Sequence, residues 1–201
     1  MLQRSMAHNA RIIGFDCISR RSIAPAPGSC QTLGVILTRT RLLKALLMLL
    51  IVLMSVGCDQ ATKQFARTGL MDRGAISVVD GVLVLHYVEN EGGFLSLGAR
   101  LPRPARTVTF VAFPLLILFW IIFSLARNKE TGWRFIMGFS FIAGGGLGNL
   151  IDRLFRDGRV SDFIIMGIGP VRTGVFNLAD LSVLVGCLLL LVGPWKSHQE
   201  A

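Results

Sequence analysis

Apolar residues are gathered into four long runs, and polar residues fill the segments between them. The second and third runs are 19 residues long, close to the ~20 residues that a helix needs to cross the hydrocarbon core of a bilayer. Pro114 lies inside the second run and is expected to kink its helix, which membrane helices tolerate. The pattern predicts an all-α membrane protein with four transmembrane helices. The runs are Leu42–Cys58, Val108–Ala126, Trp133–Ile151 and Leu181–Val192.

The last apolar run is too short to cross a membrane unless its helix begins earlier. Its 12 residues span about 18 Å as a helix, against a hydrocarbon thickness of about 30 Å. The helix is therefore expected to begin near "FNLAD" (176–180), with Asp180 one turn into it. Asn177 followed three residues later by Asp180 is a capping-box arrangement, so the acid has a purely structural interpretation as well as a functional one.

Two connecting segments have the pattern of short strands. "AISVVDGVLVLHYV" (75–88) holds two β-branched runs around Asp80-Gly81, a pair that favours a tight turn. "RVSDFII" (159–165) and "VRTGVFN" (171–177) are expected to add further strands. The sequence thus predicts a small β-platform at one surface of the membrane.

The pattern also divides the chain into three segments. Residues 1–41 are rich in Arg and Ser and show no sustained period, which indicates a disordered extension or a gene start placed too early. Residues 42–195 form the four-span domain, and residues 196–201 form a short tail. No functional residue is expected in the first segment.

Composition supports the membrane class and argues against nucleic-acid binding. Hydrophobic residues make up 52% of the chain and charged residues 16%, whereas soluble domains carry about 25% charged residues. The net charge is +9, but the basic residues do not form one groove-like cluster. Membrane lipids are the expected surroundings, and no nucleic-acid partner is expected.

The basic residues also predict the orientation. Seven of the 21 Lys and Arg residues precede or begin the first run, and three lie in the link between the second and third runs. The positive-inside rule places both segments in the cytoplasm, with residues 59–107 and 152–176 outside and both termini cytoplasmic. Because the outer segments also hold ten basic residues, interleaved with eight acids, the orientation depends mainly on the N-terminal cluster.

Cysteine and histidine residues give no sign of a metal or cofactor site. The four cysteines do not form a disulfide framework, and the chain has no CxxC, HExxH or paired histidines. We therefore expect no metal and no cofactor.

Four aspartates are expected at the same outer surface. Asp59 closes the first run and Asp152 closes the third, and both lie on the side that also holds Asp162 and Asp180. Ionisable residues at membrane depth are costly and tend to mark function. Four acids at one surface exceed what helix capping requires.

Two of these aspartates have a cation close in sequence. Asp59 and Lys63 are spaced i, i+4, which suits an ion pair along a helix. Asp152 is followed directly by Arg153, which suggests a second pair.

The other two aspartates, Asp162 and Asp180, have no adjacent cation. When two such carboxylates lie close together in a low-dielectric site, both cannot readily ionise, and one pKa rises. The pair then supplies a base to activate water and an acid to protonate a leaving group, which is the chemistry of an aspartyl hydrolase.

Small residues and an amide complete the candidate site. "AGGGLGN" (143–149) holds four glycines, and Gly144 and Gly145 are expected to let helices pack closely. Asn90 and Gly92 lie in an outer loop, where the amide could hold substrate backbone or simply form a turn.

At these residues the sequence resembles the lipoprotein signal peptidase family (signal peptidase II). The resemblance covers about residues 42–195. It rests on five motifs in chain order, "DQATK" (59–63), Asn90-Glu91-Gly92, "GGGLGNLIDR" (144–153), "VSDF" (160–163) and "FNLAD" (176–180).

The resemblance implies a four-helix aspartyl protease of the bacterial inner membrane with its active site at the periplasmic face. Such an enzyme cleaves diacylglyceryl-modified prolipoproteins just before the lipid-modified cysteine. Asp162 and Asp180 would form the catalytic dyad, with Asp152 as the rival for the first role. The residues that would bind substrate or order the site are Asp59, Lys63, Asn90, Gly92, Asn149, Asp152, Arg153 and Asn177.

Three other interpretations stay open. A catalytically altered relative is one, because Gly93-Phe94-Leu95 replaces the family's usual Ala-Ala-Phe. A transporter would place its acids in mid-span, whereas here they gather at one surface. A lipoprotein would use Gly57-Cys58 as its lipidation site, but Ser55 stands where leucine is usual and three further runs follow.

Overall fold

The computed structural model describes residues 29–93, 97–127 and 132–192. The chain divides into two compact units, residues 1–40 and 41–201. The sheet and the site described below belong to the second unit.

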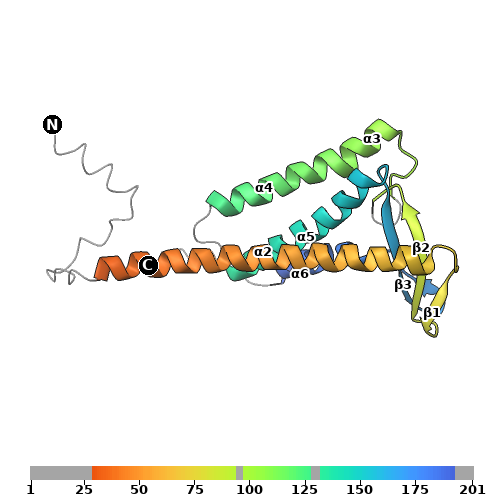
Figure 1. Ribbon diagram of the computed structural model, residues 1–201, viewed down its shortest axis with the longest axis horizontal. Coiled ribbons are helices and arrows are strands. Elements are labelled where there is room, and N and C mark those ends of the chain that lie inside the picture. The colour runs from red at the N-terminus through yellow and green to blue at the C-terminus, as the bar shows by residue number, and fades with distance from the viewer. Residues whose placement is uncertain (1–28, 94–96, 128–131, 193–201) are drawn as a thin grey trace. The chain divides into compact units, whose positions relative to one another are not determined.

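The protein is mostly helical (Figure 1). In the described residues, three stretches are long and apolar enough to cross a membrane, namely Arg39–Leu70, Arg103–Leu125 and Trp133–Phe155. The fourth apolar helix, α6, has 14 described residues. The helices are α2 (Ser29–Leu70), α3 (Arg103–Thr107), the π-helical turn η3 (Val108–Ala112), α4 (Phe113–Arg127), α5 (Trp133–Phe155) and α6 (Leu178–Leu191).

Helix α2 extends further than the apolar pattern predicts. The helix continues without a break past Asp59 to Leu70. Residues 60–68 contain neither glycine nor proline and are mostly good helix formers. About three helical turns therefore follow Cys58, and they carry polar side chains to the site.

The irregularity predicted at Pro114 takes the form of a π-helical turn. Proline has no backbone N–H, and its ring clashes with the carbonyl four residues earlier, which belongs to Phe110. The π-helical turn Val108–Ala112 lies directly before α4 and includes that residue. A wider turn at this point lets the helix continue past the proline.

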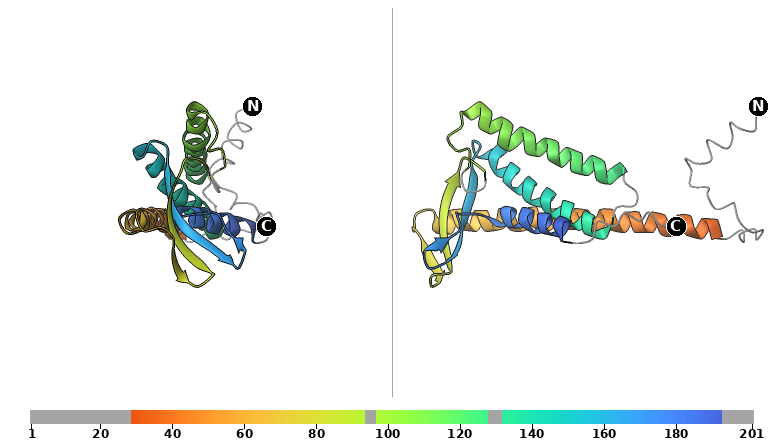
Figure 2. Two further views of the ribbon diagram at one scale, coloured as in Figure 1. Left: turned by 90° about the vertical axis from the view of Figure 1, so that its right-hand side faces the viewer. Right: turned by 180° about the vertical axis from the view of Figure 1, so that it is seen from behind.

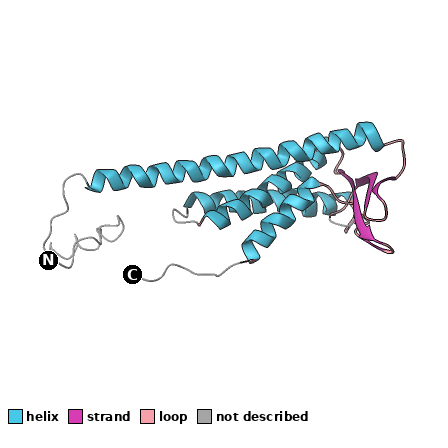
Figure 3. Cartoon of the chain, turned by 90° about the horizontal axis from the view of Figure 1, so that it is seen from below, coloured by secondary structure: helices cyan, strands magenta, loops and turns pink. Residues whose placement is uncertain are grey.

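The predicted platform is a four-stranded antiparallel sheet in the order β1-β2-β3-β4. Gly81, with φ of 73°, makes the turn between the first two strands in a conformation that favours glycine. The sheet lies at one end of the helices of the second unit (Figures 2 and 3). Its strands are β1 (Ile76–Val79), β2 (Leu83–Asn90), β3 (Val160–Ile168) and β4 (Val171–Arg172).

The register of β2 on β3 places two polar residues together. Val88 pairs with Asp162, and Asn90 pairs with Val160. Asn90 and Asp162 are thus diagonal neighbours on adjacent strands, close enough for their side chains to meet.

Glycines in α5 bring the helices close together, as the sequence predicts. A Cβ atom at Gly145 would collide with the carbonyl oxygen of Ala179 in α6. A Cβ atom at Gly144 would lie 2.6 Å from the Cβ of Ser55 in α2. Both positions therefore serve helix packing.

Candidate active site

Asp162 is buried at the start of β3 and held by two amides. The residue is 2% exposed. Its Oδ1 accepts a hydrogen bond from Asn177 Nδ2 at 2.6 Å, and its Oδ2 accepts one from Asn90 Nδ2 at 2.9 Å. Burial raises the pKa of Asp162 to about 6, and the charge of Asp180 acts in the same direction, while the two amide hydrogen bonds oppose the shift. This carboxyl group therefore keeps its proton to a higher pH than an exposed aspartate.

Asp180 lies in the first turn of α6, and the predicted capping box is confirmed. Asn177 Oδ1 accepts from the Asp180 N–H at 3.0 Å, and Asp180 Oδ2 accepts from the Asn177 N–H at 3.3 Å. Its other oxygen, Oδ1, accepts from Asn149 Nδ2 of α5 at 2.9 Å. Asp180 is half-buried, so it caps the helix and also belongs to a wider polar cluster.

Asn177 connects the two aspartates directly. Its Nδ2 group donates to Asp162, while its Oδ1 accepts from the backbone of Asp180. The same Nδ2 group also donates to Asn149 Oδ1 at 3.1 Å. One amide thus fixes the start of β3 against the start of α6.

A fully buried lysine lies beside this cluster. Lys63 is 0% exposed, and its Nζ lies 2.7 Å from Asp59 Oδ2, which confirms the predicted pair. Lys63 Nζ also donates to Asn149 Oδ1 at 2.9 Å. Because that oxygen is occupied by donors, the Nδ2 group of Asn149 is the one that points to Asp180.

Asp59 holds the beginning of α6. Its Oδ1 accepts from the backbone N–H of Ala179 at 2.9 Å, which satisfies one of the free donors at the helix N-terminus. A Cβ atom at Gly148 would lie 2.6 Å from Asp59 Oδ2, so α5 must present a glycine here.

Asp152 does not form the predicted ion pair with Arg153. Neighbouring residues on a helix are about 100° apart around its axis, and these two side chains make different contacts. Asp152 is 0% exposed, and its Oδ2 accepts from the Ser161 N–H at 3.0 Å. Its ion-pair partners are Lys63 at 3.4 Å, Arg67 at 3.3 Å and Arg156 at 3.5 Å.

Arg153 instead contacts the segment that follows β2. Its Nη2 donates to the carbonyl oxygen of Gly92 at 2.9 Å, and its guanidinium lies 5.4 Å from the centre of the Phe110 ring. It also interacts electrostatically with Asp180 and Asp162. Arg153 therefore ties this segment to the aspartates.

Asn90, the last residue of β2, forms a turn with the residues that follow, and its side-chain amide also contacts the carboxylate of Asp162. Asn90 Oδ1 accepts from the Gly92 N–H at 2.8 Å, and Asn90 Nδ2 donates to the Gly93 carbonyl at 2.9 Å as well as to Asp162. The turn interpretation of Asn90 is therefore correct. Of the residues that depart from the family pattern, Phe94 and Leu95 lie outside the described residues.

Sequence reasoning missed three polar residues of the cluster, Gln60, Arg67 and Ser161. Gln60 Nε2 donates to the Gly148 carbonyl at 3.1 Å. Arg67 Nε donates to Ser161 Oγ at 3.0 Å. Gln60 and Arg67 share the polar stripe of Asp59 and Lys63, so extending the predicted helix past Cys58 would have found them.

The geometry suits acid–base hydrolysis. One carboxyl group is buried with a raised pKa, and the other is half-buried and fixed by hydrogen bonds. Within the described ranges, no group of three His, Cys, Asp or Glu residues could hold a metal ion.

The chain is similar to known proteins in sequence and in fold. The family model for signal peptidase (SPase) II matches residues 51–195. A lipoprotein signal peptidase of Syntrophomonas wolfei subsp. wolfei is 35% identical over 140 residues, which cover 70% of this chain and 87% of that protein. One from Leifsonia xyli subsp. xyli is 33% identical over 177 residues, covering 84% and 77%. A solved bacterial membrane enzyme has a TM-score of 0.66 at 25% identity, covering 77% of this chain and 93% of that one.

Proposed function

The chain belongs to the signal peptidase II family, and from this membership we propose that Asp162 and Asp180 are its catalytic dyad. As a lipoprotein signal peptidase, the protein is an aspartic protease that removes signal peptides from prolipoproteins. The observation that carries the assignment of the dyad is Asn177, which donates to both carboxylates, to Asp162 from its side-chain amide and to Asp180 from its backbone N–H.

The two carboxyl groups take different roles in the proposed mechanism. Asp180 is the more exposed of the two and acts as the base, taking a proton from the water that attacks the scissile carbonyl. Asp162 is buried, has the raised pKa, and gives its proton to the departing amide nitrogen. The C–N bond breaks, and the products are a carboxylic acid and an amine.

The surrounding residues hold this geometry. Asn149 and Asn177 orient the aspartates, and Asn90 donates to Asp162. Arg153 fixes Gly92, and Lys63 fixes Asn149. Asp59 and Asp152 are buried counterions of Lys63. Because both oxygens of Asp152 are already engaged by cations and the Ser161 N–H, Asp152 is a positioning residue rather than the rival catalytic acid.

The pH dependence of cleavage tests the assigned roles. The quantity to measure is kcat/KM for a lipidated peptide across pH, because it reports the free enzyme. We expect a bell-shaped profile whose alkaline limb has a midpoint near pH 6, because Asp162, with a pKa of about 6, loses its proton above that pH. The acid limb falls when both carboxyl groups are protonated and no base is left.

The same profile is expected with and without EDTA, because no metal takes part in the proposed mechanism. Chelator inhibition that zinc reverses, or a rate that keeps rising into the alkaline range, would contradict the dyad.

The proposed setting is the bacterial inner membrane, with four spans and both termini in the cytoplasm. α6 would be the fourth span, and the sheet and the dyad would lie at the periplasmic face, where diacylglyceryl-modified prolipoproteins present their cleavage site. Membrane lipids surround the helices, and nucleic acid has no role. The N-terminal cluster of basic residues supports this orientation.

Reporter fusions test the orientation. A reporter joined after Lys129 is expected in the cytoplasm, and one joined after Gly158 is expected in the periplasm. Alkaline phosphatase activity, which requires export, gives the readout. The reverse pattern would place the dyad on the wrong side for exported substrates and refute the proposed topology.

A further inference from the structure

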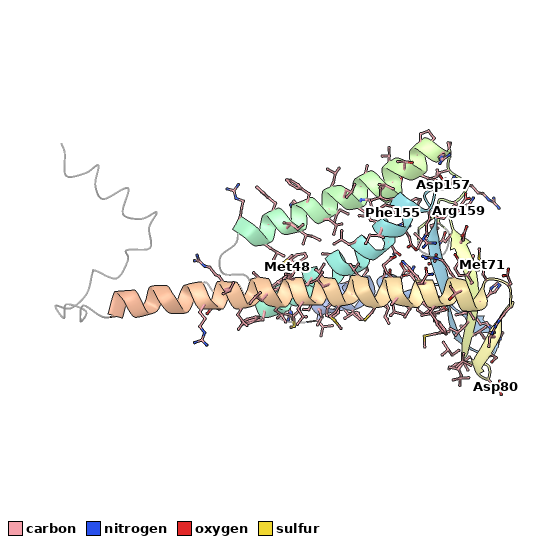
Figure 4. The ribbon with its side chains drawn as sticks, in the orientation of Figure 1. Met48, Met71, Asp80, Phe155, Asp157 and Arg159 are labelled. Carbon is pink, nitrogen blue, oxygen red and sulfur yellow. The ribbon has the colours of Figure 1, made fainter. Side chains whose placement is uncertain are left out.

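A basic cavity of about 270 Å³ lies where the second membrane helix meets the end of α5. Asp157 lies beside α3 at that end (Figure 4). The cavity is separate from the contacts that hold the dyad, apart from Arg153, which borders both. The lining residues that matter here are Arg103, Arg106, Phe110, Arg153, Leu154 and Asp157.

The lining has three guanidinium groups and one carboxylate. Arg103 lies 3.1 Å from Asp157, but the two side chains are 74% and 83% exposed, and such exposed pairs contribute little. Arg106 is bonded to Glu91, outside the lining. Three guanidinium groups against the carboxylates of Asp157 and Glu91 leave one net positive charge at the cavity.

One N–H group of Arg153 has no hydrogen-bond acceptor among the described residues. Its Nη2 is bonded to Gly92, but its Nε is buried, and no described residue accepts a hydrogen bond from it. A buried donor without an acceptor is costly. Because Nε itself is buried, a molecule in the cavity would contact another part of the Arg153 side chain, which lines it.

The cavity is placed at the depth of lipid headgroups. The second candidate span begins at Arg103, so the arginines lie where the apolar helix ends. Further along the second helix from Arg103 and Arg106 the lining is apolar, with Phe110 and Val111. Further along the helix, Leu116 and Phe119 are 66% and 68% exposed, as expected for side chains that contact acyl chains.

We propose that this cavity binds the phosphate group of one anionic phospholipid. Guanidinium groups match phosphate oxygens in geometry and charge, and basic pockets between membrane helices bind lipid headgroups. The apolar lining accommodates the beginning of the acyl chains. A phospholipid with a cationic headgroup fits less well, because the cavity is already positive.

Lipid binding to the full-length protein tests this proposal. The protein in neutral detergent is titrated with phosphatidylglycerol or phosphatidylcholine, and bound lipid is counted by native mass spectrometry. One phosphatidylglycerol is expected to bind in preference to phosphatidylcholine. Arg103→Gln is expected to weaken phosphatidylglycerol binding about fivefold. Asp157→Asn is expected to bind this lipid at least as tightly as the wild type does, because the variant lacks the carboxylate that competes for Arg103.

Arg73→Gln is the matched control, because it removes the same charge from an exposed turn after α2 and should leave binding unchanged. Opposite effects of Arg103→Gln and Asp157→Asn separate a binding site from a structural ion pair, whose two variants would behave alike. Equal binding of both lipids, an equal loss in Arg73→Gln, or displacement of the lipid by millimolar inorganic phosphate would overturn the proposal.

Discussion

Replacing either Asp162 or Asp180 with asparagine is expected to abolish signal peptide cleavage while the protein still accumulates in the membrane. Each general acid or base contributes about 10²–10⁴-fold to the rate, so kcat should fall by at least that factor in each variant. Asparagine keeps the size of the side chain but cannot exchange a proton at working pH. In Asp162→Asn, a new NH₂ group would also meet the amide donors of Asn90 and Asn177.

The measurement is kcat and KM on a lipidated peptide at equal amounts of membrane-inserted protein. Asp80→Asn is the matched control, since it makes the same chemical change in the turn between β1 and β2, where Asp80 accepts only from Ser77 at 3.4 Å among the contacts described. Figure 4 shows Asp80 at the tip of the sheet. Cleavage at the wild-type rate in either dyad variant would transfer the catalytic role to Asp152.

The elements that the sequence predicted well are those whose signals are local. The capping box of Asn177 and Asp180 involves residues three apart, and the turn at Asp80-Gly81 needs only a short hairpin. The apolar runs located α4 and α5 because bilayer thickness sets the length of a spanning helix. The glycine-rich stretch predicted close helix packing, because small side chains let two helices approach closely whatever the neighbouring sequence is.

The contacts that assemble the site could not be predicted in this way. The partners of Asp152 include residues of α2, as many as 92 residues away in the case of Gln60, and Ser161 at the start of β3. Sequence adjacency favoured Arg153, but helical geometry turns that side chain toward Gly92. The end of α2 was missed because the apolar pattern stops at Cys58, whereas its polar turns are stabilised by contacts with α5 and α6.

Lys63→Met is expected to lower the free energy of unfolding by about 3–5 kcal/mol, the usual cost of breaking a buried ion pair by removing one partner. Lys63, Asp59 and Asp152 are all 0% exposed. Without the ammonium, Asp59 keeps only neutral donors, and Asn149 Oδ1 keeps only one of its two donors, the Nδ2 group of Asn177. Unfolding in detergent, followed by circular dichroism with increasing denaturant, gives the measurement. Lys44→Met on the same helix is the control, because it removes the same charge from a half-buried side chain whose ammonium lies 5.5 Å from the Trp133 ring centre.

The double variant Asp59→Asn/Lys63→Met separates the structural role of Lys63 from its effect on the dyad. In the single variant, Asp59 is a buried carboxylate without its ammonium. The double variant also removes that carboxylate, so part of the lost stability should return. Cleavage should recover less than stability does, because the Asn149 amide that donates to Asp180 is then held by Asn177 alone and no longer by Lys63. A double variant that regains activity along with stability would show that Lys63 acts on the site only by keeping the protein folded. If Lys63→Met is instead as stable as Lys44→Met, the buried charges are not held by this lysine.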